Sequence, residues 1–337
     1  MGFHLSDGTL YTYLQGNEYE DIPAAWDWNL IPGTTTDYAA TPFICANFTG
    51  IESFVGGASD GQIGVAAMRY TNPYTRTLNW QKTWFFFEDD VQYVMVSKLR
   101  SATSAPVYSV LDQRRHNGNI FVDGQAVTQS SNFTVFNTLW HGSVGYSFDS
   151  SPGYSGLSVE VGDKTGDWST IGTSKQPPVT VDLFAAYLSH ASLALGIPTS
   201  YSAFPATSSL DEFLQKKKRT KLKATQNDDH ISAVYDENHH TLMIVFWDPA
   251  GGSTIAELFD APLTITSNGN SAVIYQLDTG NVTVSDPTQT LTSLEIEMRA
   301  GLGKRPPHWG WKFTQRLSFE LPTSGMAGSS VTKTISE

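Results

Sequence analysis

Hydrophobic and polar residues alternate over short stretches along most of this chain. Leu294, Ile296 and Met298 fall on one face of a short segment and two glutamates fall on the other, which is the period-two pattern of a half-buried strand. Other segments of strand length are rich in β-branched and aromatic residues, namely 91–96, 120–122, 242–247 and 272–277. Turn-forming pairs such as Asn117-Gly118 separate such segments. The pattern predicts an all-β protein.

Helix signals are few. Residues 181–195 fit either a helical turn or a pair of strands, and residues 209–212 resemble a short capped turn. So many strands cannot lie in one flat sheet, so we expect stacked sheets that form a large sandwich. The polar stretch 236–240 predicts a boundary between a large β-domain at 1–240 and a smaller β-sandwich at 241–325, followed by a flexible tail at 326–337.

The composition narrows the classes of partner. Hydrophobic residues make up 40% and charged residues 16% of the 337 positions, which is typical of a folded protein. The formal net charge of -12 argues against a nucleic-acid binder, which needs an extensive basic face. A polyanionic ligand would instead need a local basic patch. The one dense basic run consists of Lys216, Lys217, Lys218, Arg219, Lys221 and Lys223.

Signals for membranes and export are missing from the sequence as it stands. No apolar run approaches the roughly 20 residues that span a bilayer, so we expect no membrane association. Residues 1–16 show no signal peptide pattern. Cys45 is the single cysteine, so an intrachain disulfide is excluded and the redox compartment cannot be inferred.

An ordered set of short motifs carries a family resemblance. Residues 26–36 read Trp-Asp-Trp-Asn-Leu-Ile-Pro-Gly-Thr-Thr-Thr, which resembles the start of the central β-domain of polysaccharide lyase family 8, the family of hyaluronate, chondroitin AC and xanthan lyases. Further segments follow in the family's order: 2–8, 54–57, 82–90, 111–114, 122–124, 140–146, 166–171 and 285–288. The resemblance thus extends over nearly the whole chain.

The resemblance implies a large antiparallel supersandwich followed by a smaller C-terminal β-sandwich. In the family an N-terminal (α/α) toroid precedes them, and the polysaccharide lies between toroid and supersandwich. Such lyases cleave uronic-acid polysaccharides by β-elimination, in which the carboxylate is neutralised, a base takes the C5 proton and an acid protonates the leaving oxygen. The implied partners are therefore an acidic polysaccharide and a toroid domain. The full-length family member is expected to be extracellular, and no cofactor is expected.

The family's catalytic residues have no counterpart in this sequence. The resemblance implies that they lie on the toroid and in a segment just before Gly2-Phe3, so that all of them would precede Met1. We therefore expect the chain to be inactive by itself. His141 and Tyr146 have suitable chemistry for proton transfer. A Gly-bracketed aromatic run more often packs between sheets, so the structural interpretation of this pair is favoured.

Two groups are candidates for substrate binding. Trp26 and Trp28 would face one side of a strand, where they could stack on sugar rings or pack in the core, and core packing is favoured. Lys216, Lys217, Lys218 and Arg219 could hold carboxylated or sulfated glycans. An exposed edge strand or loop kept soluble by lysines is at least as plausible for this run.

A metal site is not indicated. Asp228, Asp229, His230, His239 and His240 include metal-ligating types, but two or three ligands on one hairpin without a fourth do not make a site. We interpret them as a solvated turn.

The sequence therefore predicts the β-domain portion of a polysaccharide lyase, carbohydrate-binding and cleft-forming. The alternative is a stand-alone lectin-like β-sandwich protein that binds carbohydrate. A purely structural or secreted surface protein is a third possibility, because no residue pattern demonstrates glycan contact. Which polysaccharide is bound does not follow from the sequence.

Overall fold

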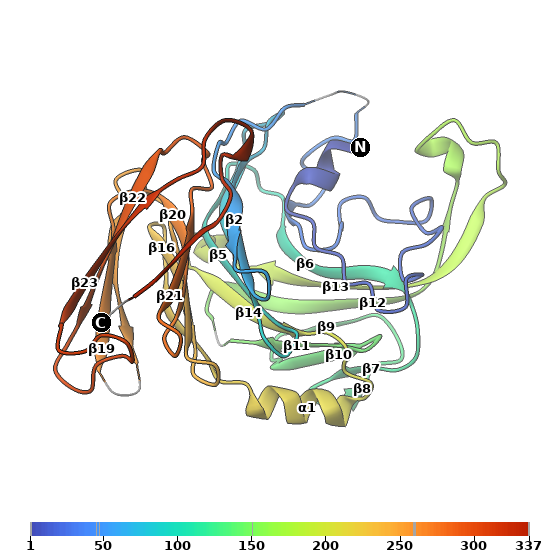
Figure 1. Cartoon of the computed structure of the whole chain (residues 1–337). Helices are drawn as coiled ribbons and strands as arrows, with labels where there is room; N and C mark the ends of the chain where they lie inside the picture. Colours follow the sequence, from blue (N-terminus) through green and yellow to red (C-terminus); the bar gives the residue numbers. More distant parts are fainter. Residues whose placement is uncertain (1, 45, 47, 150, 259–260, 336–337) are drawn as a thin grey trace. The chain divides into compact units, whose positions relative to one another are not determined.

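A computed structural model describes residues 2–44, 46, 48–149, 151–258 and 261–335, so that Met1 and Cys45 lie outside the described residues (Figure 1). Strands dominate, and the predicted all-β fold is confirmed. Among these residues the helices are α1 (Leu210–Arg219) and four short 3-10 turns at Gly2–Ser6, Trp168–Thr170, Ser192–Ala194 and Ser324–Met326.

In the described part of the chain the strands form four sheets. Neighbouring strands run antiparallel, as in β12 with β13 and β16 with β17. The five-stranded sheet has the order β1 (Thr35–Asp37), β6 (Val107–Arg115), β13 (Val179–His190), β12 (Tyr154–Gly166), β9 (Ser131–Phe133). The nine-stranded sheet has the order β2 (Val55–Ser59), β3 (Gly64–Thr71), β4 (Leu78–Phe87), β5 (Val91–Ser101), β14 (Thr199–Phe204), β11 (Val144–Phe148), β10 (Thr138–His141), β7 (Ile120–Val122), β8 (Gln125–Ala126).

The two remaining sheets come from the last third of the chain. The six-stranded sheet has the order β15 (Leu222–Asn227), β16 (Ile231–Asp236), β17 (Thr241–Phe246), β20 (Ser271–Gln276), β21 (Asn281–Ser285), β24 (Val331–Thr334). The four-stranded sheet has the order β18 (Gly252–Glu257), β19 (Pro262–Ser267), β22 (Ser293–Ala300), β23 (Thr314–Glu320). The predicted strands at 91–96, 120–122, 242–247, 272–277 and 294–298 are therefore confirmed, with bounds that differ by a few residues.

Packing divides the chain into two compact units. Unit 1 comprises residues 1–51, 70–80 and 98–215, and unit 2 comprises residues 52–69, 81–97 and 216–337. Each unit is discontinuous in sequence. The predicted domains 1–240 and 241–325 are continuous stretches of sequence, which this division by packing does not test, so they stay a prediction. Residues 331–334, which the sequence analysis assigns to a tail, form β24 because their backbone pairs with β21.

Unit 1 is a sandwich in its own right. Phe184 of β13 packs against His141 of β10, with ring centroids 4.1 Å apart, so the five-stranded sheet faces the β10–β11 strands. Leu139, Leu157 and Leu188 are fully buried. Strands β12 and β13 continue beyond this core as a long hairpin, and the turn Trp168–Thr170 lies near its end (Figure 1).

Unit 2 has its main core between the six-stranded and four-stranded sheets. β17 is buried along its whole length, because its apolar residues serve both faces of the six-stranded sheet. Leu242, Ile244 and Phe246 join the core shared with β19 and β22. On the opposite side, Trp247 packs against Phe54 with ring centroids 4.6 Å apart.

A tight corner follows β21. Asp286 is buried, and its carboxylate accepts hydrogen bonds from the backbone of Thr288, Thr290 and Leu291 and from Asn270 at 2.6–2.8 Å. These bonds outweigh the effect of burial and hold the pKa of Asp286 below its ordinary value. This Ser-Asp-Pro-Thr motif therefore has a structural role.

Two local predictions are wrong. Residues 209–212 begin the ten-residue helix α1 rather than an isolated turn, because Ser209 caps it and the following Gln, Lys and Arg residues favour helix. Trp26 and Trp28 lie in a turn rather than on a strand. For residues 181–195, the structure selects the strand β13 followed by a 3-10 turn.

Candidate functional site

An aromatic cluster lies near the start of unit 1 and contains both predicted tryptophans. We define it as Tyr11, Tyr13, Tyr19, Trp26 and Trp28. Tyr11 stacks on Trp26 with centroids 6.2 Å apart and planes inclined by 11°, and Trp26 meets Trp28 edge to face at 5.8 Å. Residues 11–28 form turns and bends and contain no strand. The rings are therefore brought together by the path of this loop.

The cluster is buried at its base and open at its rim. Tyr19 is 7% exposed and packs with Ile22 and Leu183, whereas Tyr13 is 58% exposed. Trp26 and Trp28 are half-buried. The two tryptophans thus pack partly in the core and keep part of their surface accessible. Their role in binding stays a proposal.

A buried charge network supports the cluster from below. Tyr19 donates a hydrogen bond to Asp112 at 2.9 Å and accepts one from Arg114 at 2.9 Å, and Asp112 and Arg114 form an ion pair. Arg114 also donates to the backbone oxygen of Thr12 at 3.1 Å. This buried network ties Tyr19 and the backbone of Thr12 to β6 and so fixes the loop that carries the exposed aromatic rings.

The phenol of Tyr11 is harder to ionise than a free tyrosine. Burial, with smaller contributions from Tyr13 and Asp112, raises the pKa of Tyr11 to about 12. Tyr11 therefore stays protonated at neutral pH. Rings and a hydroxyl together suit the alternating apolar faces and hydroxyl edges of sugars.

His141 and Tyr146 lie inside the unit 1 sandwich. They are 2% and 4% exposed, on the paired strands β10 and β11. Burial lowers the pKa of His141 to about 3 and raises the pKa of Tyr146 well above its ordinary value. Because a sugar cannot reach either side chain, this geometry agrees with the structural interpretation. The expectation that the family's catalytic residues precede Met1 lies outside the described residues and stays a prediction.

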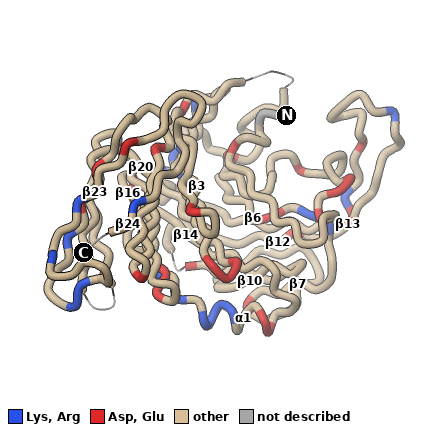
Figure 2. Tube along the Cα trace, in the orientation of Figure 1, with Lys and Arg blue, Asp and Glu red and all other residues tan. Residues whose placement is uncertain are grey.

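The basic run is divided between two elements. Lys216, Lys217, Lys218 and Arg219 form the last turn of α1, and Figure 2 shows acidic residues toward one end of this helix and basic residues toward the other. This distribution offsets the helix dipole. Lys223 lies on β15, at the edge of the six-stranded sheet. This placement does not test whether the run binds glycan, so that role stays a proposal.

The three histidines considered as metal ligands each lie against a different aspartate. His230 pairs with Asp248 at 2.5 Å, His239 with Asp236 at 2.7 Å, and His240 with Asp278 at 3.0 Å. Asp228 accepts hydrogen bonds from the backbone of residues 230 and 231 in a turn. In the described part of the chain, no three His, Cys, Asp or Glu residues gather in a way that could hold a metal ion.

These stacked sheets define a β-sandwich protein, and its aromatic cluster is partly open at the surface. Residues 1–217 match the super-sandwich domain of polysaccharide lyase family 8, and residues 224–295 match the C-terminal beta-sandwich domain of the same family. Since the matches cover most of the sequence, the chain belongs to polysaccharide lyase family 8.

Individual relatives agree with this assignment. The chain is 26% identical over 343 residues to chondroitinase-AC of Pedobacter heparinus, and the match covers 98% of this chain and 46% of the relative. A solved chondroitinase AC lyase matches with a TM-score of 0.84 at 24% identity, covering 98% of this chain and 48% of the other. A Paenibacillus xanthan lyase matches with a TM-score of 0.80 at 21% identity, covering 98% and 33%. The chain therefore spans half or less of the length of these relatives.

Within the described residues, no helix is long and apolar enough to serve as a membrane span.

One exposed feature of unit 2 was not among the sites predicted from the sequence. Arg305 lies over the rings of Trp311 and Phe313, at 5.4 and 4.6 Å from their centroids. A Trp two residues after another Trp, flanked by cations, is the sequence signal that could have found it.

Proposed function

We propose that this chain forms the β portion of a lyase that cleaves an acidic polysaccharide by β-elimination. The observation that carries the proposal is the match over 98% of this chain to about half of chondroitinase-AC. In this proposal the β portion holds the polysaccharide and forms one wall of the cleft. The enzyme would be secreted, because its polymeric substrate is extracellular.

The chemistry assigns a limited role to these residues. In β-elimination a base removes the C5 proton, the electron pair forms the C4–C5 double bond, and the C4–O bond breaks as an acid protonates the leaving oxygen. His141 and Tyr146 are too buried to take part. We therefore assign binding and orientation to this chain and proton transfer to groups on a toroid domain.

The aromatic cluster is the proposed contact with the polymer. Tyr13 and Trp28 would stack on sugar rings, while the Asp112–Arg114 pair holds the cluster in place. Lys216, Lys217, Lys218 and Arg219 are a second proposed contact, through their charges. Charge contacts should weaken as salt rises, whereas stacking should persist.

Two measurements test the proposal. The full chain, with chondroitin sulphate, hyaluronate or xanthan, should produce no ultraviolet absorbance from an unsaturated uronate. Addition of a separately produced toroid domain of a chondroitin AC lyase should restore product formation. Product from the chain alone, lost in His141→Ala, would refute our assignment, and glycan binding that never yields product would favour the lectin-like alternative.

Binding itself is tested by substitution. Trp28→Ala and Tyr13→Ala should each weaken glycan binding about 3- to 10-fold, because a stacking contact contributes about 1 kcal/mol. Tyr74→Ala is the matched control, since Tyr74 is a 44% exposed aromatic residue of the same unit that lies outside the cluster. Equal affinities for all three variants would remove the aromatic cluster from the proposal.

A further inference from the structure

The connection between β22 and β23 exposes an unusual amount of apolar surface. Trp311 is 90% exposed, Leu302 93% and Phe313 51%. Single exposed apolar residues are ordinary, but several large ones on one short loop indicate a contact surface. The loop belongs entirely to unit 2.

The loop is held in place rather than loosely attached. Trp309 is fully buried, and its indole nitrogen donates to the Tyr275 hydroxyl at 2.9 Å. The backbone nitrogen of Ala300 donates to the oxygen of Phe313 at 2.9 Å and closes the loop. One tryptophan therefore anchors the segment while Trp311, two positions later, is presented to solvent.

A cation is built into the exposed surface. The guanidinium of Arg305 lies 5.4 Å from the Trp311 ring centroid and 4.6 Å from that of Phe313, and it donates to the backbone oxygen of Trp311 at 2.6 Å. These contacts order Arg305 between two rings and leave Trp311 largely open. An ordered arginine keeps donors for a carboxylate or sulfate at little further entropic cost.

The local charge opposes that of the whole protein. Between Met298 and Phe319 there are five Lys or Arg residues and no Asp or Glu, in a chain with a formal net charge of -12. One of the five, Arg316, pairs with Glu297 at 2.6 Å. The net positive charge of this segment favours a polyanion over a neutral or cationic partner.

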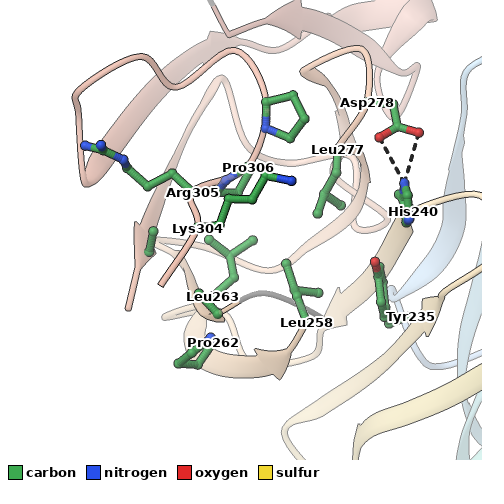
Figure 3. Close-up of a pocket in the computed structure, with 13 residues that line it drawn as sticks. Tyr235, His240, Leu258, Pro262, Leu263, Leu277, Asp278, Lys304, Arg305 and Pro306 are labelled. Atoms are coloured by element: carbon green, nitrogen blue, oxygen red, sulfur yellow. Dashed lines mark hydrogen bonds and ion pairs between the residues drawn. The ribbon is translucent and has the colours of Figure 1, made fainter. Parts of the chain in front are cut away.

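A pocket of about 160 Å³ adjoins the loop (Figure 3). Its wall is apolar, from Leu258, Leu263 and Leu277, and its rim includes Lys304 and the His240–Asp278 pair. In Figure 3 the Lys304 side chain reaches over the leucines, and Arg305 extends away from them. Of these two consecutive cations, Lys304 therefore lies at the pocket and Arg305 contacts the exposed rings.

We propose that the β22–β23 connection, residues 301–313, is a second binding site for acidic polysaccharide. Trp311 stacks on a sugar ring, Arg305 binds a carboxylate or sulfate, and the leucine pocket accepts an apolar substituent of the sugar near Lys304. The choice of a glycan as the anionic ligand rests on the proposed function. The site would tether the polymer without taking part in its cleavage.

The test uses the full chain and three variants. Trp311→Ala and Arg305→Gln should each weaken binding of chondroitin sulphate or hyaluronate about 5- to 10-fold at low salt. Arg316→Gln is the matched control, because it removes the same charge from an arginine already paired with Glu297. Comparison of the two polymers separates sulfate from carboxylate recognition, and dextran serves as the neutral control.

Each outcome is decisive. Binding unchanged in Trp311→Ala and Arg305→Gln, but weakened in Trp28→Ala, would overturn the second site and leave the proposed function intact. Equal losses in Arg305→Gln and Arg316→Gln would mean general charge attraction and would also overturn it. If Trp311→Ala leaves glycan binding unchanged and instead abolishes self-association measured by sedimentation, the surface binds a second copy of the chain and the glycan site is overturned. Absence of binding to either polymer overturns the site, while product formation with added toroid still tests the proposed function separately.

Discussion

His141 offers a direct probe of the unit 1 sandwich because its imidazole is buried and uncharged. The ring packs on Phe184 at 4.1 Å, and its Nδ1 lies 3.3 Å from the backbone oxygen of Asn119. Burial is the main cause that lowers the pKa of His141 to about 3, and the neighbouring charges of His116 and Arg114 act in the same direction. Protonation of His141 should therefore oppose folding.

The sign and size follow from linkage. An unfolded histidine has a pKa of about 6.5, so between about pH 6.5 and pH 3 the unfolded chain binds a proton that the folded chain does not. Stability is then lost as the pH falls through this window. At about 1.4 kcal/mol for each pH unit, the loss is about 2.5 kcal/mol between about pH 7 and pH 4.5 and up to about 5 kcal/mol over the whole window.

The assay compares urea unfolding of the full chain with that of His141→Gln across this range. The difference between the two free energies of unfolding cancels the contributions of other acidic groups. We expect wild type to lose about 2.5 kcal/mol relative to the variant on going from about pH 7 to about pH 4.5. Parallel pH profiles for the two proteins would refute a buried, neutral imidazole.

His239→Gln is a control of opposite sign. Burial acts to lower the pKa of His239, but Asp236, Glu88 and Asp89 outweigh it and raise the pKa. Its contribution is present below about pH 6.5 and is lost as the pH rises through the raised pKa. Wild type should therefore gain stability relative to His239→Gln as the pH falls.

Three further substitutions, with Gly172→Ala as a control for the first, test buried positions. Gly145→Ala would place a methyl group 2.1 Å from the Phe213 ring, and we expect a loss of about 1–3 kcal/mol in thermal unfolding, whereas Gly172→Ala, with no neighbour closer than 3.8 Å, should be nearly neutral. Lys82 is fully buried, and burial lowers its pKa to about 7, so wild type should gain stability from about pH 7.5 to pH 9 by about 2 kcal/mol relative to Lys82→Met; equal slopes in urea unfolding would contradict this. Asp286→Asn should cost about 1.5–3 kcal/mol at neutral pH and abolish that part of the acid sensitivity that the depressed pKa confers; an unchanged acid midpoint would count against it.

The strands were predictable because burial on one face of a sheet imposes alternation. β22 shows this directly, since Leu294, Ile296 and Met298 are buried between exposed or half-exposed neighbours. The length of α1 was not predictable in this way, because Phe213 is its only buried residue. The Trp26–Trp28 spacing was misleading, since a turn can also place every second residue on one side.

The chemistry of the site depends on contacts that local sequence does not encode. The Tyr19–Asp112 hydrogen bond joins residues 93 positions apart, and no periodicity reveals such a pair. The sequence did not indicate the positive segment around Arg305, because its cations are spread from 299 to 316 rather than gathered in a run. The contact of Arg305 with the rings of Trp311 and Phe313 forms only once the loop closes.

The composite origin of unit 2 has a practical consequence for protein engineering. Phe54 packs on Trp247, and the Ser285 hydroxyl donates to the oxygen of Gly57 at 2.8 Å, across 228 positions of sequence. A transplant of residues 224–337 into another scaffold would omit Phe54 and β2 and leave Trp247 uncovered. A transplant of this sandwich must therefore also carry residues 52–69 and 81–97. It requires joining three separate segments of the chain rather than moving one.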